Sequence, residues 1–178
     1  MGGIRTKQQI DVFDYAGNIC KAMKKGILLT TKSGSRVNTM TIGWGKLGVE
    51  WNKPIFIAYV RESRFTRQLL EENGEFTVNI PHGSVDSKIL SYCGTHSGRD
   101  TDKLRDLNLT LEEPLTVSAP GIRELPLTLE CKVIYKQPQD LEAIPADLLS
   151  RFYPEENGVR DRHIAFYGEI QAAYLISD

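Results

Sequence analysis

The sequence predicts a mainly β fold with helices at its periphery. Short runs of β-prone residues recur along the chain, and turn-forming residues separate them. Strands do not alternate regularly with helices, as they would in a doubly wound parallel sheet. We therefore expect a mainly antiparallel barrel of about six or seven strands. The chain has 178 residues, which suits one domain over residues 1–178, with residues 1–25 as an N-terminal helical extension.

The first half of the chain provides two helices and most of the strands. A helix is expected over residues 11–25, where apolar residues recur at helical spacing and Asp11 can cap the start. A second helix is expected over residues 63–72, with Ser63 as its N-cap. The strands expected here are 26–31, 37–44, 54–60 and 75–80.

The second half of the chain is expected to contain three short helices and two strands. Two short helices that flank a polar loop are expected within residues 84–108. Residues 127–135 alternate apolar with polar, which predicts a half-buried strand. A short helix over 145–152 and a long final strand over 163–176, interrupted by Gly168, complete the expected elements.

Charge and hydropathy exclude two classes of partner. The formal net charge is −1, and basic residues are scattered among acids, so we expect no binding to nucleic acid. Apolar runs such as Ile55–Val60 are far shorter than the roughly 20 residues that span a bilayer, so we expect no membrane association. Residues 1–7 have no apolar stretch behind their charges, so no signal peptide is expected.

The cysteines and histidines predict neither a disulfide framework nor a metal site. The three cysteines are an odd number and show no C-x-x-C spacing. The three histidines are widely dispersed. A reducing compartment, the cytoplasm, is therefore the expected location.

Polar side chains stand out on the strand expected over residues 37–44. Asn38, Thr39 and Thr41 place amide and hydroxyl groups on both faces of the strand. Such groups could bind a planar polar ring with Trp44 packed beside it, although threonine also suits strands for structural reasons alone. This segment leaves both interpretations open.

The segment after the third strand has the composition of a phosphate site. It opens a helix, whose free N–H groups and dipole favour an anion. Ser63 and Thr66 add hydroxyl donors, and Arg61, Arg64 and Arg67 add positive charge. The alternative is a capped helix start with solvated arginines.

Two further segments carry candidate ligands. In Cys93–Lys103, two glycines permit close backbone approach, and Ser97, Arg99 and Lys103 can donate, but an exposed loop has a similar composition. A Cys93 nucleophile is disfavoured because no orienting group accompanies the neighbouring histidine. His163, at the start of the last strand, is either a ligand contact or a structural residue. The common nucleotide-binding and hydrolase motifs are missing.

Taken in order along the chain, five segments resemble the flavin reductase-like family, and most closely its flavoredoxin branch. The segments are Asn38–Trp44, Pro54–Thr66, Glu75–Pro81, Cys93–Lys103 and His163–Glu169. The match runs from about Gly26 to Ile176. The resemblance implies an FMN-binding split β-barrel and a homodimer that holds the flavin near its subunit interface.

The resemblance also implies a role for each segment. One strand would face the isoalloxazine ring and ribityl chain, a helix start would hold the phosphate, and the polar loop would close the other side. The residues carried over for the strand are Asn38, Thr39, Met40 and Thr41, with Trp44 beside them. Those for the phosphate are Ser63, Arg64, Phe65 and Thr66, with Arg61, and those for the loop are Cys93, Gly94, Ser97, Gly98, Arg99 and Lys103.

His163 matches a position close to where nicotinamide stacks in the NAD(P)H-dependent members. Here Asp161-Arg162 precedes it, where those members more often have a glycine. His163 is therefore a candidate nicotinamide or substrate contact, and NAD(P)H a candidate electron donor. No protein acid or base is required, because the flavin carries the chemistry.

The implied function is an FMN-dependent oxidoreductase of the NAD(P)H-linked flavin reductase type. The alternative is a non-enzymatic FMN electron carrier that a protein partner reduces. A binding module without redox use is disfavoured by the full set of polar segments. The electron donor and acceptor, whether small molecules or proteins, stay open.

Overall fold

A computed structural model describes residues 6–177, and all statements about structure concern this range. The two ends of the predicted domain and the first residues of the expected N-terminal extension, residues 1–5 and 178, lie outside it.

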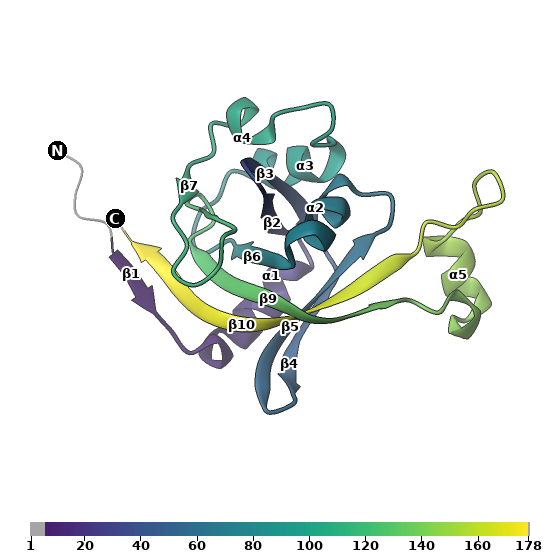
Figure 1. Cartoon of the computed structure of the whole chain (residues 1–178), viewed down its shortest axis with the longest axis horizontal. Helices are drawn as coiled ribbons and strands as arrows, with labels where there is room; N and C mark the ends of the chain where they lie inside the picture. Colours follow the sequence, from purple (N-terminus) through teal and green to yellow (C-terminus); the bar gives the residue numbers. More distant parts are fainter. Residues whose placement is uncertain (1–5, 178) are drawn as a thin grey trace.

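One curled antiparallel sheet forms the body of the molecule (Figure 1). Its strand order is β3-β2-β6-β9-β10-β5-β4, and β1 adds to β10. The strands are β1 (Thr6–Gln9), β2 (Ile27–Ser33), β3 (Arg36–Ile42), β4 (Gly45–Glu50), β5 (Lys53–Arg61), β6 (Glu75–Ile80), β9 (Leu127–Pro138) and β10 (His163–Ser177). A separate pair joins β7 (Leu111–Glu112) to β8 (Gly121–Ile122). The predicted mainly antiparallel fold is confirmed.

Helices lie around this sheet, as predicted. They are α1 (Ala16–Met23), α2 (Phe65–Asn73), α3 (Ser87–Thr95), α4 (Lys103–Asp106) and α5 (Ala146–Phe152), with 3-10 turns at Val12–Tyr15 and Leu141–Ala143. The helix expected over 11–25 begins as the first of these turns, where the Asp11 carboxylate accepts the Phe13 N–H. Gly26, at a φ of +110°, ends this segment in a conformation that other residues rarely adopt.

The core fills the interior of the curled sheet. Large apolar side chains from β2, β5, β6, β9 and β10 meet there without solvent exposure, among them Leu29, Phe56, Phe76, Leu129 and Phe166. Gly168 on β10 is required by this packing, because a Cβ at that position would lie 2.5 Å from the Phe76 ring. Instead of interrupting the strand, Gly168 lies at a register shift within continuous β10.

The prediction of a half-buried strand over 127–135 was wrong for its first part. Residues 127–131 are buried on both faces of β9. Glu130 is fully buried, and its carboxylate accepts the N–H groups of Leu115 and Thr116 at 2.7 and 2.6 Å. These bonds satisfy the charge and fasten the connecting loop over the face that was expected to meet solvent.

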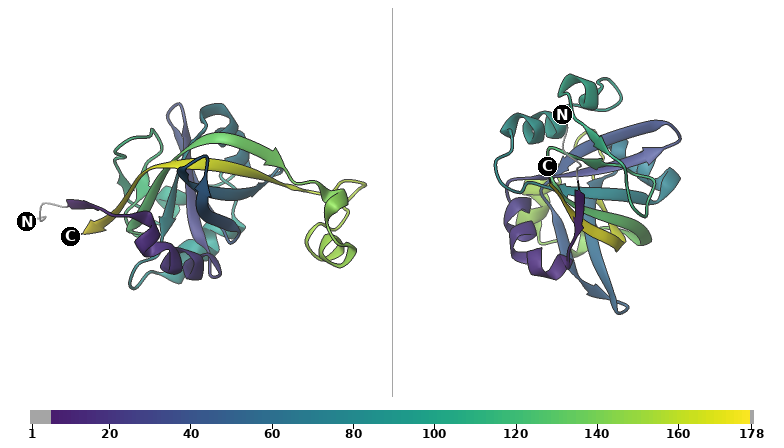
Figure 2. Two further views of the ribbon diagram at one scale, coloured as in Figure 1. Left: turned by 90° about the horizontal axis from the view of Figure 1, so that it is seen from below. Right: turned by 90° about the vertical axis from the view of Figure 1, so that its left-hand side faces the viewer.

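The β9–β10 hairpin continues beyond the barrel as an arm, with α5 near its tip (Figure 2). None of the α5 residues is buried. No helix in the described part of the chain is long and apolar enough to cross a membrane.

Candidate functional site

Two cavities lie next to each other along β3 and have Met40 and Arg64 in common. The first, of about 150 Å³, lies between β3, the start of α2 and the loop that links α3 to α4. The second, of about 190 Å³, lies between the end of β3, β5 and the start of β10. Together they form one elongated site that is polar along most of its walls.

Most residues predicted for the site line these cavities. Those around the first are Asn38, Met40, Ser63, Arg64, Phe65, Thr66, Cys93, Ser97, Gly98, Arg99 and Lys103. Those around the second are Met40, Thr41, Trp44, Arg61, Arg64 and His163. The fold therefore brings together four segments that are distant in the sequence.

Thr39 and Gly94 line neither of the two cavities. The Thr39 hydroxyl accepts from the Thr30 hydroxyl at 2.9 Å and donates to the Leu29 carbonyl at 3.3 Å. Gly94 belongs to α3 and packs against Thr41. Because side chains alternate along a strand, Asn38 and Met40 face the first cavity while Thr39 faces away.

Lys103 supplies a buried positive charge at the first cavity. Its side chain is almost fully enclosed, with 5% exposure, and its ammonium donates to the carbonyls of Thr39 at 2.9 Å and Cys93 at 3.0 Å. Burial lowers the pKa of Lys103, and the nearby charge of Arg64 contributes. Within residues 6–177 no carboxylate pairs with this ammonium. Because an ammonium has three donors, the third can bind an anion.

The start of α2 adds uncapped backbone donors to the same cavity. Arg64 is the N-cap in an extended conformation, and no side chain caps the first N–H groups of this nine-residue helix. The predicted N-cap, Ser63, was wrong, because its N–H and hydroxyl bind the Asp161 carboxylate at 3.0 and 2.6 Å. Thr66 accepts from the Asn38 amide at 2.7 Å, so its own hydroxyl hydrogen can still be donated.

The loop between α3 and α4 closes over Asn38. A Cβ at Gly98 would lie 2.0 Å from the Asn38 Oδ1 atom, so this close approach requires glycine. Arg36, which the sequence analysis missed, donates to the Gly98 carbonyl at 2.8 Å and lies over the Phe65 ring at 4.2 Å. Arg99 donates to the Ser63 carbonyl at 3.1 Å.

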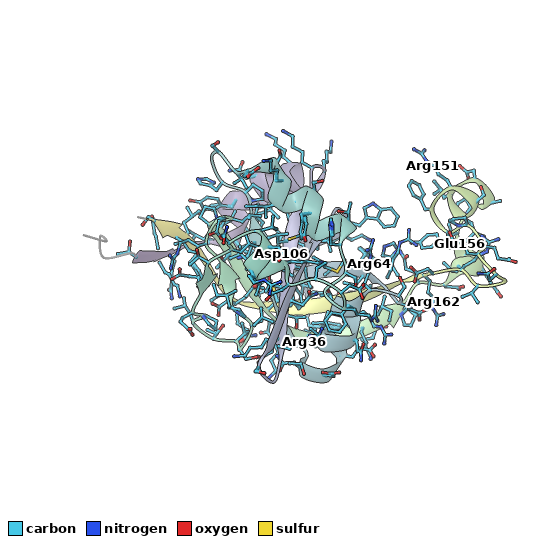
Figure 3. All side chains as sticks on the ribbon, turned by 90° about the horizontal axis from the view of Figure 1, so that it is seen from above. Arg36, Arg64, Asp106, Arg151, Glu156 and Arg162 are labelled. Atoms are coloured by element: carbon cyan, nitrogen blue, oxygen red, sulfur yellow. The ribbon has the colours of Figure 1, made fainter. Side chains whose placement is uncertain are left out.

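The first cavity is therefore lined by several cations and by no acid among the described residues. Figure 3 places Arg64 and Arg36 on the barrel, whereas Arg151 and Glu156 belong to the arm. Helix N–H groups together with basic side chains are the usual donors for a phosphate group.

The surroundings of Cys93 disfavour a nucleophile. The thiol is buried, and burial raises its pKa to about 11 despite the opposing charge of Lys103. Since the thiolate is the reactive form, this raised pKa disfavours a nucleophilic role for Cys93. His96, which also lines the first cavity, stacks on Tyr92 with ring centroids 3.8 Å apart.

His163 ends the second cavity and is held in place by aromatic rings. It is 7% exposed, its Nδ1 lies 2.8 Å from the Tyr153 hydroxyl, and its ring lies 4.7 Å from that of Trp44. Burial lowers the pKa of His163 to about 4, with Arg61 the next cause, so the ring is neutral at pH 7. Sequence reasoning missed Tyr153, and it also missed Tyr59, which lines this cavity from β5.

Arg61 lines the second cavity, but its guanidinium is already occupied. It donates to the backbone carbonyls of Asp161 at 2.6 Å and Phe152 at 2.9 Å. Arg61 therefore fastens the base of the arm to β5. Arg64, by contrast, has no ion pair or side-chain hydrogen bond within residues 6–177 and is free to meet a ligand.

Comparison with known proteins identifies the family of the chain. The family model described as flavin reductase like domain matches residues 22–178. A protein of Archaeoglobus fulgidus is 34% identical over 97 residues, 54% of each chain. The protein YddH of Escherichia coli is 30% identical over 111 residues, 61% of this chain and 58% of its own. The matches thus span little more than half the length of these curated relatives.

Solved structures give the same fold. A flavoredoxin of Methanosarcina acetivorans is 29% identical, with a TM-score of 0.63 over 84% of this chain and 67% of its own. A flavoredoxin of Desulfovibrio vulgaris is 25% identical, also with a TM-score of 0.63, over 84% and 68% of the two chains. An NADH:FAD oxidoreductase of Streptomyces globisporus, at 19% identity and a TM-score of 0.61 over 84% and 75%, shares the fold alone. The chain belongs to the flavin reductase-like family.

Proposed function

We propose that this protein binds FMN along β3 and acts as a flavin-dependent oxidoreductase. The phosphate would occupy the first cavity, and the isoalloxazine ring would occupy the second. The observation that carries this proposal is the buried ammonium of Lys103, which has no carboxylate partner in the described structure and faces the uncapped start of α2. A charge buried without a partner is costly, so a bound anion would stabilise it.

The residues present fit such a cofactor. Backbone N–H groups at the start of α2, the Thr66 hydroxyl, Arg64 and Lys103 surround one compact anion site. This arrangement favours a single phosphate group, and therefore FMN over FAD. A bound flavin would accept and pass on electrons, while the protein binds it, orients it and adjusts its electrostatics.

Several aromatic side chains hold one another in place around the second cavity, where the isoalloxazine ring would lie. Tyr153 bonds the Nδ1 atom of His163, and Trp44 lies against the same imidazole. Because His163 is neutral at pH 7, it offers the second cavity an uncharged ring nitrogen. Arg64 lines both cavities and could pair with the phosphate while it borders the ring.

We further propose that the protein is a cytoplasmic homodimer whose arm packs against a second copy. The arm exposes apolar side chains, including Leu148 at 43% and Val159 at 68%. All three cysteines, Cys20, Cys93 and Cys131, are free thiols, which suits a reducing compartment.

One experiment tests both the cofactor and the electron donor. The purified protein is reconstituted with FMN, freed of excess flavin and mixed anaerobically with NADH or NADPH. Loss of the absorbance of oxidised flavin with either nucleotide supports an NAD(P)H-linked reductase. Loss only with a reducing protein favours the electron carrier, the second candidate. Failure to retain any flavin would overturn the proposal.

A further inference from the structure

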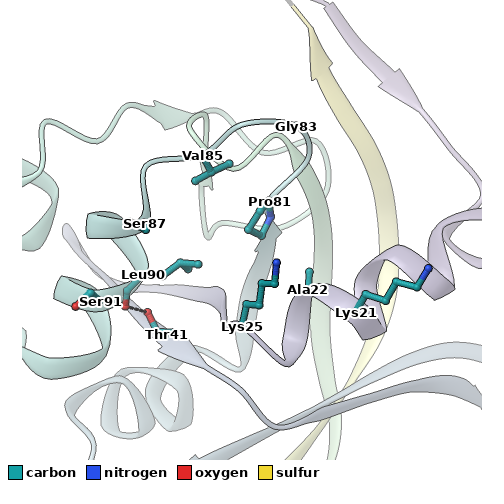
Figure 4. Close-up of a pocket in the computed structure, with 10 residues that line it drawn as sticks. All are labelled: Lys21, Ala22, Lys25, Thr41, Pro81, Gly83, Val85, Ser87, Leu90 and Ser91. Atoms are coloured by element: carbon teal, nitrogen blue, oxygen red, sulfur yellow. Dashed lines mark hydrogen bonds between the residues drawn. The ribbon is translucent and has the colours of Figure 1, made fainter.

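A cavity larger than either of those in the candidate flavin site lies beside them. It has a volume of about 670 Å³ and lies between α1, the segment that follows β6, and α3 (Figure 4). Its lining residues are Lys21, Ala22, Lys25, Thr41, Pro81, Gly83, Val85, Ser87, Leu90 and Ser91. This size is typical of a small-molecule site.

The walls of this cavity combine apolar side chains with one positive charge. Figure 4 shows Lys25 extending toward Pro81, whereas Lys21 points away along α1. Within residues 6–177, Lys25 has no ion pair or hydrogen bond through its ammonium. Asp86, which lies in the sequence between the lining residues Val85 and Ser87, caps α3 by accepting the Lys88 N–H at 2.9 Å.

Thr41 forms a wall between this cavity and the ring end of the candidate flavin site, because it lines both. The Thr41 hydroxyl donates to the Leu90 carbonyl at 2.6 Å. Its methyl group is close to Gly26, where a Cβ would lie 2.8 Å from it. Thr41 is therefore held in place by packing where the two cavities adjoin.

We propose that this cavity is a second binding site, for a small apolar carboxylate. The hydrocarbon part would lie against Pro81, Val85 and Leu90, and the carboxylate would pair with the ammonium of Lys25. Apolar walls with a single charged group at one end select this amphiphilic class over neutral or strongly charged ligands. The proposal goes beyond the flavin function and needs no bound flavin.

Calorimetry with two probes of equal shape tests this inference. The probes are 2-naphthoate and 2-naphthylmethanol, both titrated with FMN present in excess. Naphthoate should bind about fivefold more tightly, as expected for a solvent-accessible ion pair of about 1 kcal/mol. Lys25→Gln should abolish this preference, and Lys24→Gln, at the exposed C-cap of α1, should retain it.

A blocking variant locates the site. Val85→Trp should fill the cavity and prevent binding of both probes. Retained FMN binding or, without flavin, an unchanged circular dichroism spectrum shows that the variant is folded. Three results would overturn the proposal: equal affinity for the two probes, equal losses from the Lys25 and Lys24 variants, or displacement of naphthoate by FMN. Because the readout does not use flavin chemistry, its failure is distinguishable from failure of the proposed function.

Discussion

Replacement of Arg64 by alanine separates a phosphate contact from a solvated arginine at the start of a helix. The Arg64 side chain is exposed and has no partner within the described chain, so its loss should leave the fold intact. A hydrogen bond to a charged group contributes about 1.5–3 kcal/mol. Because Arg64 is exposed, we expect the lower end, which weakens FMN binding about tenfold. Riboflavin, which has no phosphate, should change by less than about twofold.

Arg67→Ala is the matched control for this experiment. It removes the same charge from the first turn of the same helix, but the Arg67 guanidinium is held by the Glu62 carbonyl at 3.0 Å and by Glu71 at 3.2 Å. Its dissociation constants for both flavins should therefore stay within about twofold of the unmodified protein. Quenching of flavin fluorescence gives all the constants. Equal losses for FMN and riboflavin in Arg64→Ala would refute the phosphate assignment.

Three other changes test neighbouring parts of the site. Lys103→Met should weaken FMN binding about 100-fold, near the upper end of the range for a hydrogen bond from a buried charged donor, and riboflavin binding less than about tenfold. Fluorescence titration measures both losses, and equal losses would contradict this assignment. Gly98→Ala must displace Asn38, so urea unfolding should show a loss of about 1–3 kcal/mol, and an unchanged midpoint would contradict the packing argument. The pKa of His163 is about 4 in the folded protein, against 6.5 in the unfolded chain. The contribution of His163 to stability is therefore fully present above about pH 6.5 and is lost as the pH falls toward 4. His163→Gln should therefore lose less stability than the unmodified protein between about pH 7.5 and about pH 5 in urea titrations, and an identical pH dependence would refute this.

Local sequence signals predicted the elements whose residues favour one structure. The β-prone run of β2 and the Gly74 stop of α2, at a φ of +72°, are examples. Strand β4 was missed because it carries two glycines and lacks clear alternation. Its turn to β5, Trp51-Asn52, holds both residues at positive φ, where asparagine-glycine would have been the recognisable signal. At the start of β4, glycine is needed at position 45 because a Cβ on Gly45 would lie 2.9 Å from the Phe56 ring.

The site was predicted where it depends on short segments and missed where it depends on long-range contacts. Ser63 has a side chain that suits an N-cap, but its hydroxyl binds the carboxylate of Asp161, 98 residues away, and does not cap α2. Arg36 and Tyr59 carried no local signal, since Arg36 is the first residue of β3, directly after a turn, and Tyr59 lies in the apolar strand β5. Only the folded chain brings these residues to the two cavities.

The most direct test of the central claim is the affinity of the unmodified protein for FMN compared with riboflavin. The two ligands differ only in the phosphate, which we place against Lys103, Arg64 and the start of α2. Isothermal titration should give FMN a dissociation constant at least about 100-fold lower than that of riboflavin, since two or more charge-assisted bonds are involved. Equal dissociation constants for the two ligands would contradict the account.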